Sequence, residues 1–469
     1  MNVGRVAALF ACLLQGACLA LAVQPQGLAH RLHAPDGARD IPDGSVTAKL
    51  RGGSGGGQRL KYAHRTMQEL VVDMAGFPLE EHFISTADGY VLGTYRIPSG
   101  QRPQHSSRQE DAAAAAAHGP GTIASANSSC ARPAVLLLHG LLDSSAAWVL
   151  NEPGQSLGFI LADAGYDVWL GNSRGNAFSR NHTGLDPAYA PFWDFTWDDM
   201  AAYDVPAMVD YVLQQTGCAR LAFVGHSQGT TQAFGALAAN PGLRDRLSLA
   251  VMLAPAVHMR FIQSPALRVL AAMDADTLFT LLGVSEFLPS RRATADIFGQ
   301  LCRQTPAVCT SIITAIAGFN ADNMNMTRLP MMVQYAPSGT SVKNLAHWAQ
   351  AIRKSRQRQR PLFQQYDYGT VCNTPAGLPQ TCNMRVYHSV EPPSYQLGDI
   401  RSPPLAVFYG GRDRLADAAD VATLLAALPA GAVVYSQVEP SYEHIDFTWG
   451  IDASTRVYPA VLDLLRMYP

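Results

Sequence analysis

The chain has 469 residues, of which 48% are hydrophobic and 15% charged, so it can bury a large globular core. Its formal net charge of −2 excludes a general electrostatic attraction to nucleic acid or to an anionic membrane. We therefore expect one large domain, or a core with a substantial inserted cap.

The N-terminus is typical of a cleavable secretory signal peptide over residues 1–22. One early basic residue, Arg5, precedes an apolar run that ends in the small-residue site Ala20-Leu21-Ala22. An uncleaved membrane anchor is the alternative, but the run is short for a bilayer span. The sequence predicts a protein of the secretory pathway, secreted or lumenal.

Cleavage would remove two of the eight cysteines and leave six in an oxidising compartment. The six candidates for disulfides are Cys130, Cys218, Cys302, Cys309, Cys372 and Cys382. The last four form two pairs that are close in sequence, so each pair would close a short loop. The first two each precede a predicted strand and would meet if those strands are neighbours. Because six cysteines allow fifteen connectivities, this pairing is a hypothesis.

Three glycosylation sequons, at Asn127, Asn181 and Asn325, agree with export.

Residues 23–62 are rich in Gly, Pro, Arg and Asp without hydrophobic periodicity, which is typical of a flexible leader. Folded sequence is expected from residue 63. Two apolar stretches, residues 81–86 and 90–97, flank Asp88-Gly89 and predict a β-hairpin. Residues 101–132 include an alanine-rich tract and predict a disordered surface insertion.

Beyond residue 132, apolar runs alternate with helical patterns, which predicts a mostly parallel central sheet with helices on both faces. The predicted strands are 133–140, 166–171, 220–225, 247–255, 403–411 and 432–440. The predicted helices are 156–165, 204–217, 230–239, 421–428 and 458–468. The alternation stops between residues 257 and 398, where apolar helical segments predict an inserted, mainly helical cap. The α/β core would then comprise residues 63–256 and 399–469.

Three serines lie in Gly-x-Ser-x-Gly sequences, and one of them is the candidate nucleophile. Ser54 lies in the leader, with no strand before it and no helix after it. Ser173 follows a predicted strand, but turn-forming residues rather than a helix come next. Ser227 lies between a predicted strand and a predicted helix, where flanking glycines permit a tight turn that exposes the hydroxyl. We therefore predict Ser227, with Ser173 as the alternative.

A nucleophilic serine needs a histidine to take its proton and a carboxylate to hold that histidine. His444 alone among the later histidines lies in a loop after the last core strand, whereas His258, His347 and His388 fall at or within the cap. Asp413 directly follows a strand and is the predicted acid.

Two other aspartates compete for the role of the acid. Asp417 precedes a helical pattern and is predicted to cap that helix. Asp446 is too close to His444 along the chain for easy pairing, and a structural role in the loop is expected.

Backbone donors for an oxyanion are predicted at two turns. The sequence HGLLDSS follows the strand 133–140, and the helix N-terminus follows Ser227. The N–H groups of Leu141 and Gln228 would converge there on one oxygen.

These residues resemble the acid lipase family, the gastric and lysosomal lipases and their plant and fungal relatives. The resemblance runs from about residue 76 to the C-terminus, outside the insertion. It is carried by GFPLEEHFISTADGYVL, LLLHGLLDSSAAWV, WLGNSRGNAFSRNH, FWDFTWDDMAAYDVPAMVDYV, GHSQGTT, GTSVKNLAHWAQ, GGRDRLAD and EHIDFTWG.

The resemblance implies an α/β-hydrolase fold and assigns roles to matching positions. The family's nucleophile, acid and base fall on Ser227, Asp413 and His444, and its oxyanion donors on Leu141 and Gln228. The GNSRG stretch around Ser173 is structural in that family. The region of Cys302 and Cys309 resembles the family's cap disulfide.

The implied reaction is hydrolysis of triacylglycerols or sterol esters through an acyl-enzyme, with the substrate at an oil–water or membrane interface. The alternatives are another esterase, an acyltransferase or a catalytically silent lipid-binding protein. No metal or organic cofactor is expected, because the sequence has neither HExxH nor a phosphate-binding glycine loop. The basic run 353–360 is predicted to be a solvated loop, with contact to anionic lipid as the alternative.

Overall fold

The structure is a computed structural model that describes residues 66–101, 130–272, 284–288, 292–374, 377 and 379–469. The predicted signal peptide and leader, including Ser54, lie outside the described residues, as do Asn127 and residues 102–129 of the predicted insertion.

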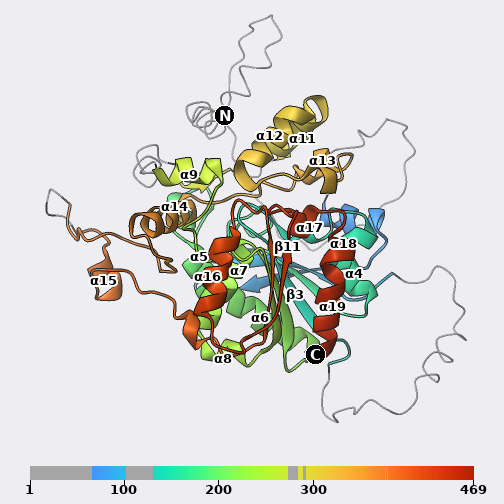
Figure 1. Cartoon of the computed structure of the whole chain (residues 1–469), viewed down its shortest axis with the longest axis horizontal. Helices are drawn as coiled ribbons and strands as arrows, with labels where there is room; N and C mark the ends of the chain where they lie inside the picture. The colour runs from blue at the N-terminus through green and yellow to red at the C-terminus, as the bar shows by residue number, and fades with distance from the viewer. Residues whose placement is uncertain (1–65, 102–129, 273–283, 289–291, 375–376, 378) are drawn as a thin grey trace, which may run out of the picture.

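Within that part of the chain, a nine-stranded sheet forms the centre of the molecule (Figure 1). Its order is β1-β2-β4-β3-β6-β7-β10-β11, with β5 paired to β2. The strands are β1 (Glu80–Ser85), β2 (Tyr90–Ile97), β3 (Ala134–Leu138), β4 (Asp167–Gly171), β5 (Asn181–His182), β6 (Leu221–His226), β7 (Leu247–Leu253), β10 (Leu405–Gly410) and β11 (Val433–Glu439). The six strands from β4 to β11 run parallel, while β1 and β2 are antiparallel. The predicted α/β class and mostly parallel sheet are confirmed.

The central strands are apolar on both faces because helices cover both. Every residue of β3, β6 and β7 is buried, as expected for a parallel sheet between two helical layers. The main helices of this core are α4 (Leu157–Asp163), α6 (Val205–Thr216), α7 (Gln228–Ala239), α16 (Ala418–Ala427) and α19 (Tyr458–Met467). Helices α6 and α7 pack together and on β3 and β6, α4 packs on β4, and α19 packs on β7.

Several short elements complete the core. They are η1 (Glu69–Met74), η2 (Ser145–Trp148), η3 (Pro153–Gln155), η4 (Ala190–Trp193), α5 (Trp197–Asp199), η5 (Met200–Asp204), α8 (Pro241–Arg244), η7 (Leu397–Asp399), α17 (Asp446–Trp449) and α18 (Ala453–Arg456).

The predicted hairpin is present in β1 and β2. Ser85 pairs with Val91 at its closed end, and Gly89 has a φ of +98°, which a residue with a Cβ rarely adopts.

Residues 257–398 are called here the cap segment, and its described helices between residues 265 and 357 lie over one end of the parallel strands (Figure 1). Its helices are α9 (Pro265–Ala272), α11 (Arg292–Gln304), α12 (Pro306–Ala317), η6 (Ala321–Asn323), α13 (Leu329–Met332), α14 (Val342–Gln357) and α15 (Asn383–Tyr387). The segment also holds a small antiparallel pair, β8 (Glu286–Phe287) with β9 (Thr340–Ser341), which its helical pattern did not predict.

The prediction of a solvated loop at residues 353–360 is wrong for most of the run. Helix α14 continues to Gln357, and its basic side chains have partners. Lys354 forms an ion pair with Asp367, and Arg358, just past the helix, pairs with Glu391. Neighbouring acidic groups therefore neutralise part of this charge.

Three disulfides join the six described cysteines in the pairs Cys130–Cys218, Cys302–Cys309 and Cys372–Cys382. The first links the entries to β3 and β6, which are neighbouring strands. The second joins α11 to α12. No helix of the described residues is long and apolar enough to cross a membrane.

Replacing both Cys130 and Cys218 by Ser should lower the free energy of unfolding by about 4–5 kcal/mol, because this bridge closes a loop of 88 residues. Replacing Cys372 and Cys382, only 10 residues apart, should cost about 3 kcal/mol. Denaturant unfolding of both double variants measures the difference. Equal losses would contradict the loop-length argument.

Candidate active site

Ser227 occupies a strained turn between β6 and α7. Its φ of 52° and ψ of −121° are unusual for a residue with a side chain. A Cβ on Gly229 would lie 2.4 Å from the carbonyl oxygen of Leu138, and one on Gly225 would lie 3.0 Å from the backbone of Gly229. The two glycines are therefore required by close backbone approach, which is the reason predicted from the sequence.

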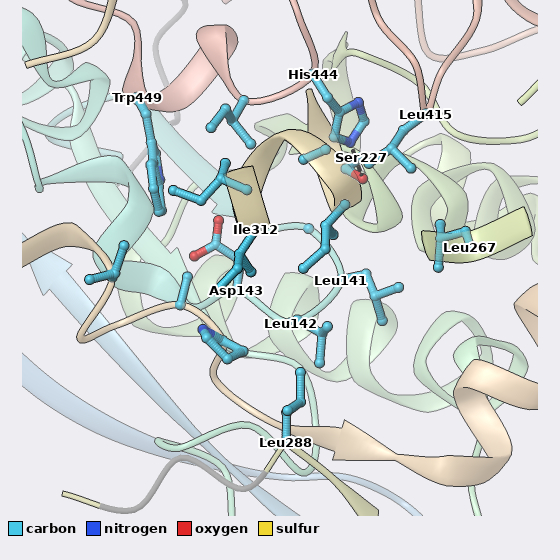
Figure 2. A pocket seen from close by; sticks show the side chains of 18 of the residues that line it. Leu141, Leu142, Asp143, Ser227, Leu267, Leu288, Ile312, Leu415, His444 and Trp449 are labelled. Atoms are coloured by element: carbon cyan, nitrogen blue, oxygen red, sulfur yellow. Dashed lines mark hydrogen bonds between the residues drawn. The ribbon is translucent and has the colours of Figure 1, made fainter. Parts of the chain in front are cut away.

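His444 lies between Ser227 and Asp413. Its Nε2 is 2.6 Å from the Ser227 hydroxyl (Figure 2). Its Nδ1 is 2.8 Å from Asp413 Oδ2. The three residues follow β6, β11 and β10, whose carboxyl ends meet at one edge of the sheet. The structure thus brings the three predicted residues together, although Ser227 and His444 are 217 positions apart in the sequence.

The other oxygen of Asp413 fixes the carboxylate. Oδ1 accepts hydrogen bonds from the backbone N–H groups of Leu415 and Ala416, both at 2.8 Å. Both oxygens therefore have donors, and the carboxylate is held in the orientation that meets the His444 ring.

His226, next to Ser227, holds the backbone of His444. Its Nε2 is 3.0 Å from the His444 carbonyl oxygen, and the two rings lie 5.0 Å apart. Burial lowers the pKa of His226 to about 3, and the neighbouring His444 lowers it further in the same sense. His226 is therefore neutral and donates to this carbonyl without placing a second positive charge beside His444.

The turn after β3 lies against Ser227. A Cβ on Gly140 would be 2.9 Å from the Ser227 Cβ, so only glycine allows this approach. The turn is closed by the N–H of Asp143, which donates to the Gly140 carbonyl at 3.3 Å. Leu141, the residue after Gly140, lines the same cavity as Ser227. Gln228 is the first residue of α7, and a helix leaves such an N–H without an internal acceptor.

The side chain of Gln228 ties this turn to the cap segment. Its Oε1 accepts from Asn344 Nδ2 at 2.9 Å and from the Trp348 indole N–H at 2.7 Å. Both donors are buried on α14, four residues apart and so on one helix face. The sequence analysis did not identify Asn344 and Trp348 as site residues. Their spacing of four residues on one predicted helix face was the only feature of the sequence that could have indicated them.

Ser173 does not reach this arrangement. Its hydroxyl is paired with Gln232 at 3.0 Å, and no helix follows it directly. The next residue, Arg174, is buried and pairs with Asp204 and Asp88. The GNSRG stretch is thus part of a buried ionic network.

The remaining candidates occupy other positions. Asp417 caps α16 by accepting from the Ala419 N–H at 2.9 Å, as expected. Asp446 accepts from the Glu443 N–H at 2.7 Å and stabilises the loop that carries His444. His347 stacks on Trp197, with ring centroids 4.2 Å apart.

A cavity of about 200 Å³ opens beside Ser227 and His444 (Figure 2). Its wall is almost entirely apolar and comes from the core and from α9, α11, α12 and α14. Cap residues in this wall include Leu267, Leu270, Phe298, Leu301, Ile312, Ile313, Ile316, Leu345 and Trp348. The hydroxyl therefore faces a site suited to apolar ligands.

Across the described residues, no group of three or more His, Cys, Asp or Glu side chains has an arrangement that could hold a metal ion.

Known proteins similar to this chain include several lipases. Residues 69–152 match the family model of a partial α/β-hydrolase lipase region, and residues 133–294 match the α/β hydrolase fold model. The chain is 37% identical over 400 residues to the lysosomal acid lipase/cholesteryl ester hydrolase of Homo sapiens, covering 85% of this chain and 90% of that protein. Lipase member K of Homo sapiens is 36% identical over 400 residues, with the same coverage. Gastric triacylglycerol lipase of Bos taurus is 36% identical over 392 residues, covering 83% and 88%.

Replacing Asn344 by Leu should slow the labelling of Ser227 by a fluorophosphonate about tenfold, because Gln228 loses one of its two donors and its backbone N–H becomes less well placed. Ser355→Ala is the matched control, because Ser355 is on the same helix and its buried hydroxyl has no hydrogen-bond partner within the described part of the chain. The labelling rate is measured by intact-protein mass spectrometry. Equal rates in both variants would show that the Asn344 contact does not position the turn.

Proposed function

The chain belongs to the family of gastric and lysosomal acid lipases within the α/β hydrolases, and from this we propose that it hydrolyses neutral lipid esters, namely triacylglycerols or sterol esters. The observation that supports this most directly is the hydrogen-bonded series Ser227–His444–Asp413 at the mouth of an apolar cavity. Relatives named for triacylglycerol and cholesteryl ester hydrolysis agree with this substrate class.

In the proposed reaction, the Ser227 oxygen attacks the ester carbonyl carbon while His444 Nε2 takes the hydroxyl proton. The Asp413 carboxylate accepts from Nδ1–H, which keeps Nε2 free as the base and stabilises the imidazolium. The negative oxygen of the tetrahedral intermediate receives hydrogen bonds from the N–H groups of Leu141 and Gln228.

Collapse of that intermediate breaks the bond to the alcohol oxygen, and His444 gives its proton to the departing alcohol. The acyl group remains on Ser227. A water molecule then attacks the acyl carbon, with His444 again as the base, and the fatty acid is released. No cofactor takes part in this sequence of steps.

The cavity suits the hydrocarbon part of a lipid ester. Its wall is built from leucine, isoleucine and aromatic side chains of both the core and the cap segment. We infer that the cap segment selects the substrate, which approaches from a lipid surface.

We also infer that the protein acts in the secretory pathway, as a secreted or lumenal enzyme. Three disulfides in one chain are typical of an oxidising compartment. The names of relatives from the lysosome and the stomach agree with this location.

Replacing Ser227 by Ala should abolish hydrolysis of emulsified triolein and cholesteryl oleate while the protein remains folded, because the attacking oxygen is lost. Free fatty acid release is measured across pH, and circular dichroism reports the fold. Ser173→Ala, in the second glycine-flanked sequence, is the matched control and should retain activity.

The opposite result, with Ser173→Ala inactive and Ser227→Ala active, would overturn the assignment of the nucleophile. A strong preference for short, soluble esters without activation at an interface would favour an esterase instead.

A further inference from the structure

One ionisable side chain in the cavity has no role in the proposed reaction. Asp143 lines the same cavity as Ser227, three residues beyond the glycine that lies against the serine. Among the described residues no cation pairs with it, and its one side-chain hydrogen bond in the structure comes from the Ser144 N–H at 2.8 Å. A charged carboxylate in an apolar wall is unfavourable unless it is paired or hydrogen-bonded, so such a group in a cavity is a candidate for ligand contact.

A second polar group of the cavity wall has no hydrogen-bond partner among the described residues. The indole nitrogen of Trp449 is buried and has no acceptor among the described residues, and the ring lines the cavity. Its helix, α17, packs on η2, which begins two residues after Asp143. Figure 2 shows Asp143 and Trp449 on one side of the cavity, and Ser227 and His444 on the other.

A ligand hydroxyl placed between these two side chains would pair with both. It can accept a hydrogen bond from the Trp449 N–H and donate one to the Asp143 carboxylate. A hydrocarbon group can do neither and would leave both polar groups unpaired. The turn closed by the Asp143 N–H and the Gly140 carbonyl fixes Asp143 three residues from the glycine that lies against Ser227.

We propose that Asp143 and Trp449 form a hydroxyl-binding subsite, which favours esters with a free hydroxyl near the scissile bond, such as monoacylglycerols, over fully apolar esters. The proposal rests on the ester hydrolase function proposed above. It adds a specificity determinant within that site and assigns neither residue a part in bond breaking.

The preference should depend on pH. Burial raises the pKa of Asp143 to about 7, and the Ser144 N–H opposes this shift only in part. Below pH 7 the carboxyl group is protonated and neutral, so an apolar chain beside it is tolerated. Above pH 7 the group is a charged carboxylate, and an apolar chain beside it is disfavoured because the carboxylate loses its hydration. A hydroxyl is favoured because it forms a charge-assisted hydrogen bond with the carboxylate.

Other titratable groups around the cavity do not share this behaviour. His226 faces it and stays neutral across this range because burial lowers its pKa to about 3. His444 also faces it but acts on both kinds of ester alike. Asp446, on α17, is held by Asn320 and Asn323 and is not part of the cavity wall.

The test compares monoolein with triolein in the same mixed micelles at pH 5.5 and pH 8.5, using the full-length secreted protein. The quantity is the ratio of the two kcat/KM values, because any effect of pH that is common to both esters cancels in it. We expect the ratio to rise about tenfold between the two pH values in the wild type. Asp143→Asn, which keeps the size and the acceptor for Ser144, should make the ratio independent of pH.

Two further variants complete the experiment. Trp449→Phe should lower the ratio at both pH values, since only the N–H donor is lost. Asp420→Asn is the matched control: burial also raises the pKa of that carboxyl, to about 6, but it accepts from the Arg260 and Phe261 N–H groups outside the cavity. Its ratio should follow that of the wild type.

The outcomes separate this proposal from the function on which it rests. A wild-type ratio that does not change with pH, in protein that hydrolyses both esters, would overturn the subsite alone. Asp143→Asn with the same pH dependence as the wild type would do so as well. Loss of all ester hydrolysis in folded wild-type protein would instead overturn the proposed function. Fluorophosphonate labelling of each variant at Ser227 verifies that the nucleophile is intact.

Discussion

The close contact of two backbone turns at the end of β3 and β6 determines the rest of the site. Gly140 lies against Ser227, and Gly229 lies against the carbonyl oxygen of Leu138, at distances that exclude any Cβ. This approach forces the unusual backbone angles of Ser227 and holds its hydroxyl out of the sheet. It also places the start of α7 beside the turn that contains Leu141.

The loops after β10 and β11 carry Asp413 and His444 to the turns that follow β3 and β6. His444 meets the hydroxyl because its own position is held from two sides, by Asp413 at Nδ1 and by His226 at the backbone carbonyl. Backbone N–H groups then orient Asp413 itself. Each group in the site is therefore supported by a second contact, which reduces the reorganisation needed during a reaction.

The cap segment contributes to the site in two different ways. It supplies apolar side chains that enclose the cavity, and through Asn344 and Trp348 it also holds the side chain of Gln228. Changes in the cap are thus expected to affect both the choice of substrate and the turn that contains Gln228, the proposed oxyanion donor. The polar pair of Asp143 and Trp449 shows that the wall of this cavity is not uniform.

The sequence by itself determined the α/β class, the alternation of strands and helices along the chain, and the candidate nucleophile, Ser227 in preference to Ser173. These depend on local physical rules: the hydrophobic period of each element, the steric demand for glycine at a tight turn, and the helix that must follow it. Only the tertiary structure decided the small β8–β9 pair, the helical conformation of residues 353–357 in the basic run, and the contacts of His226, Asn344 and Asp143. Those features depend on side chains distant in sequence that meet only when the core and the cap segment pack together, and no local pattern specifies such a meeting.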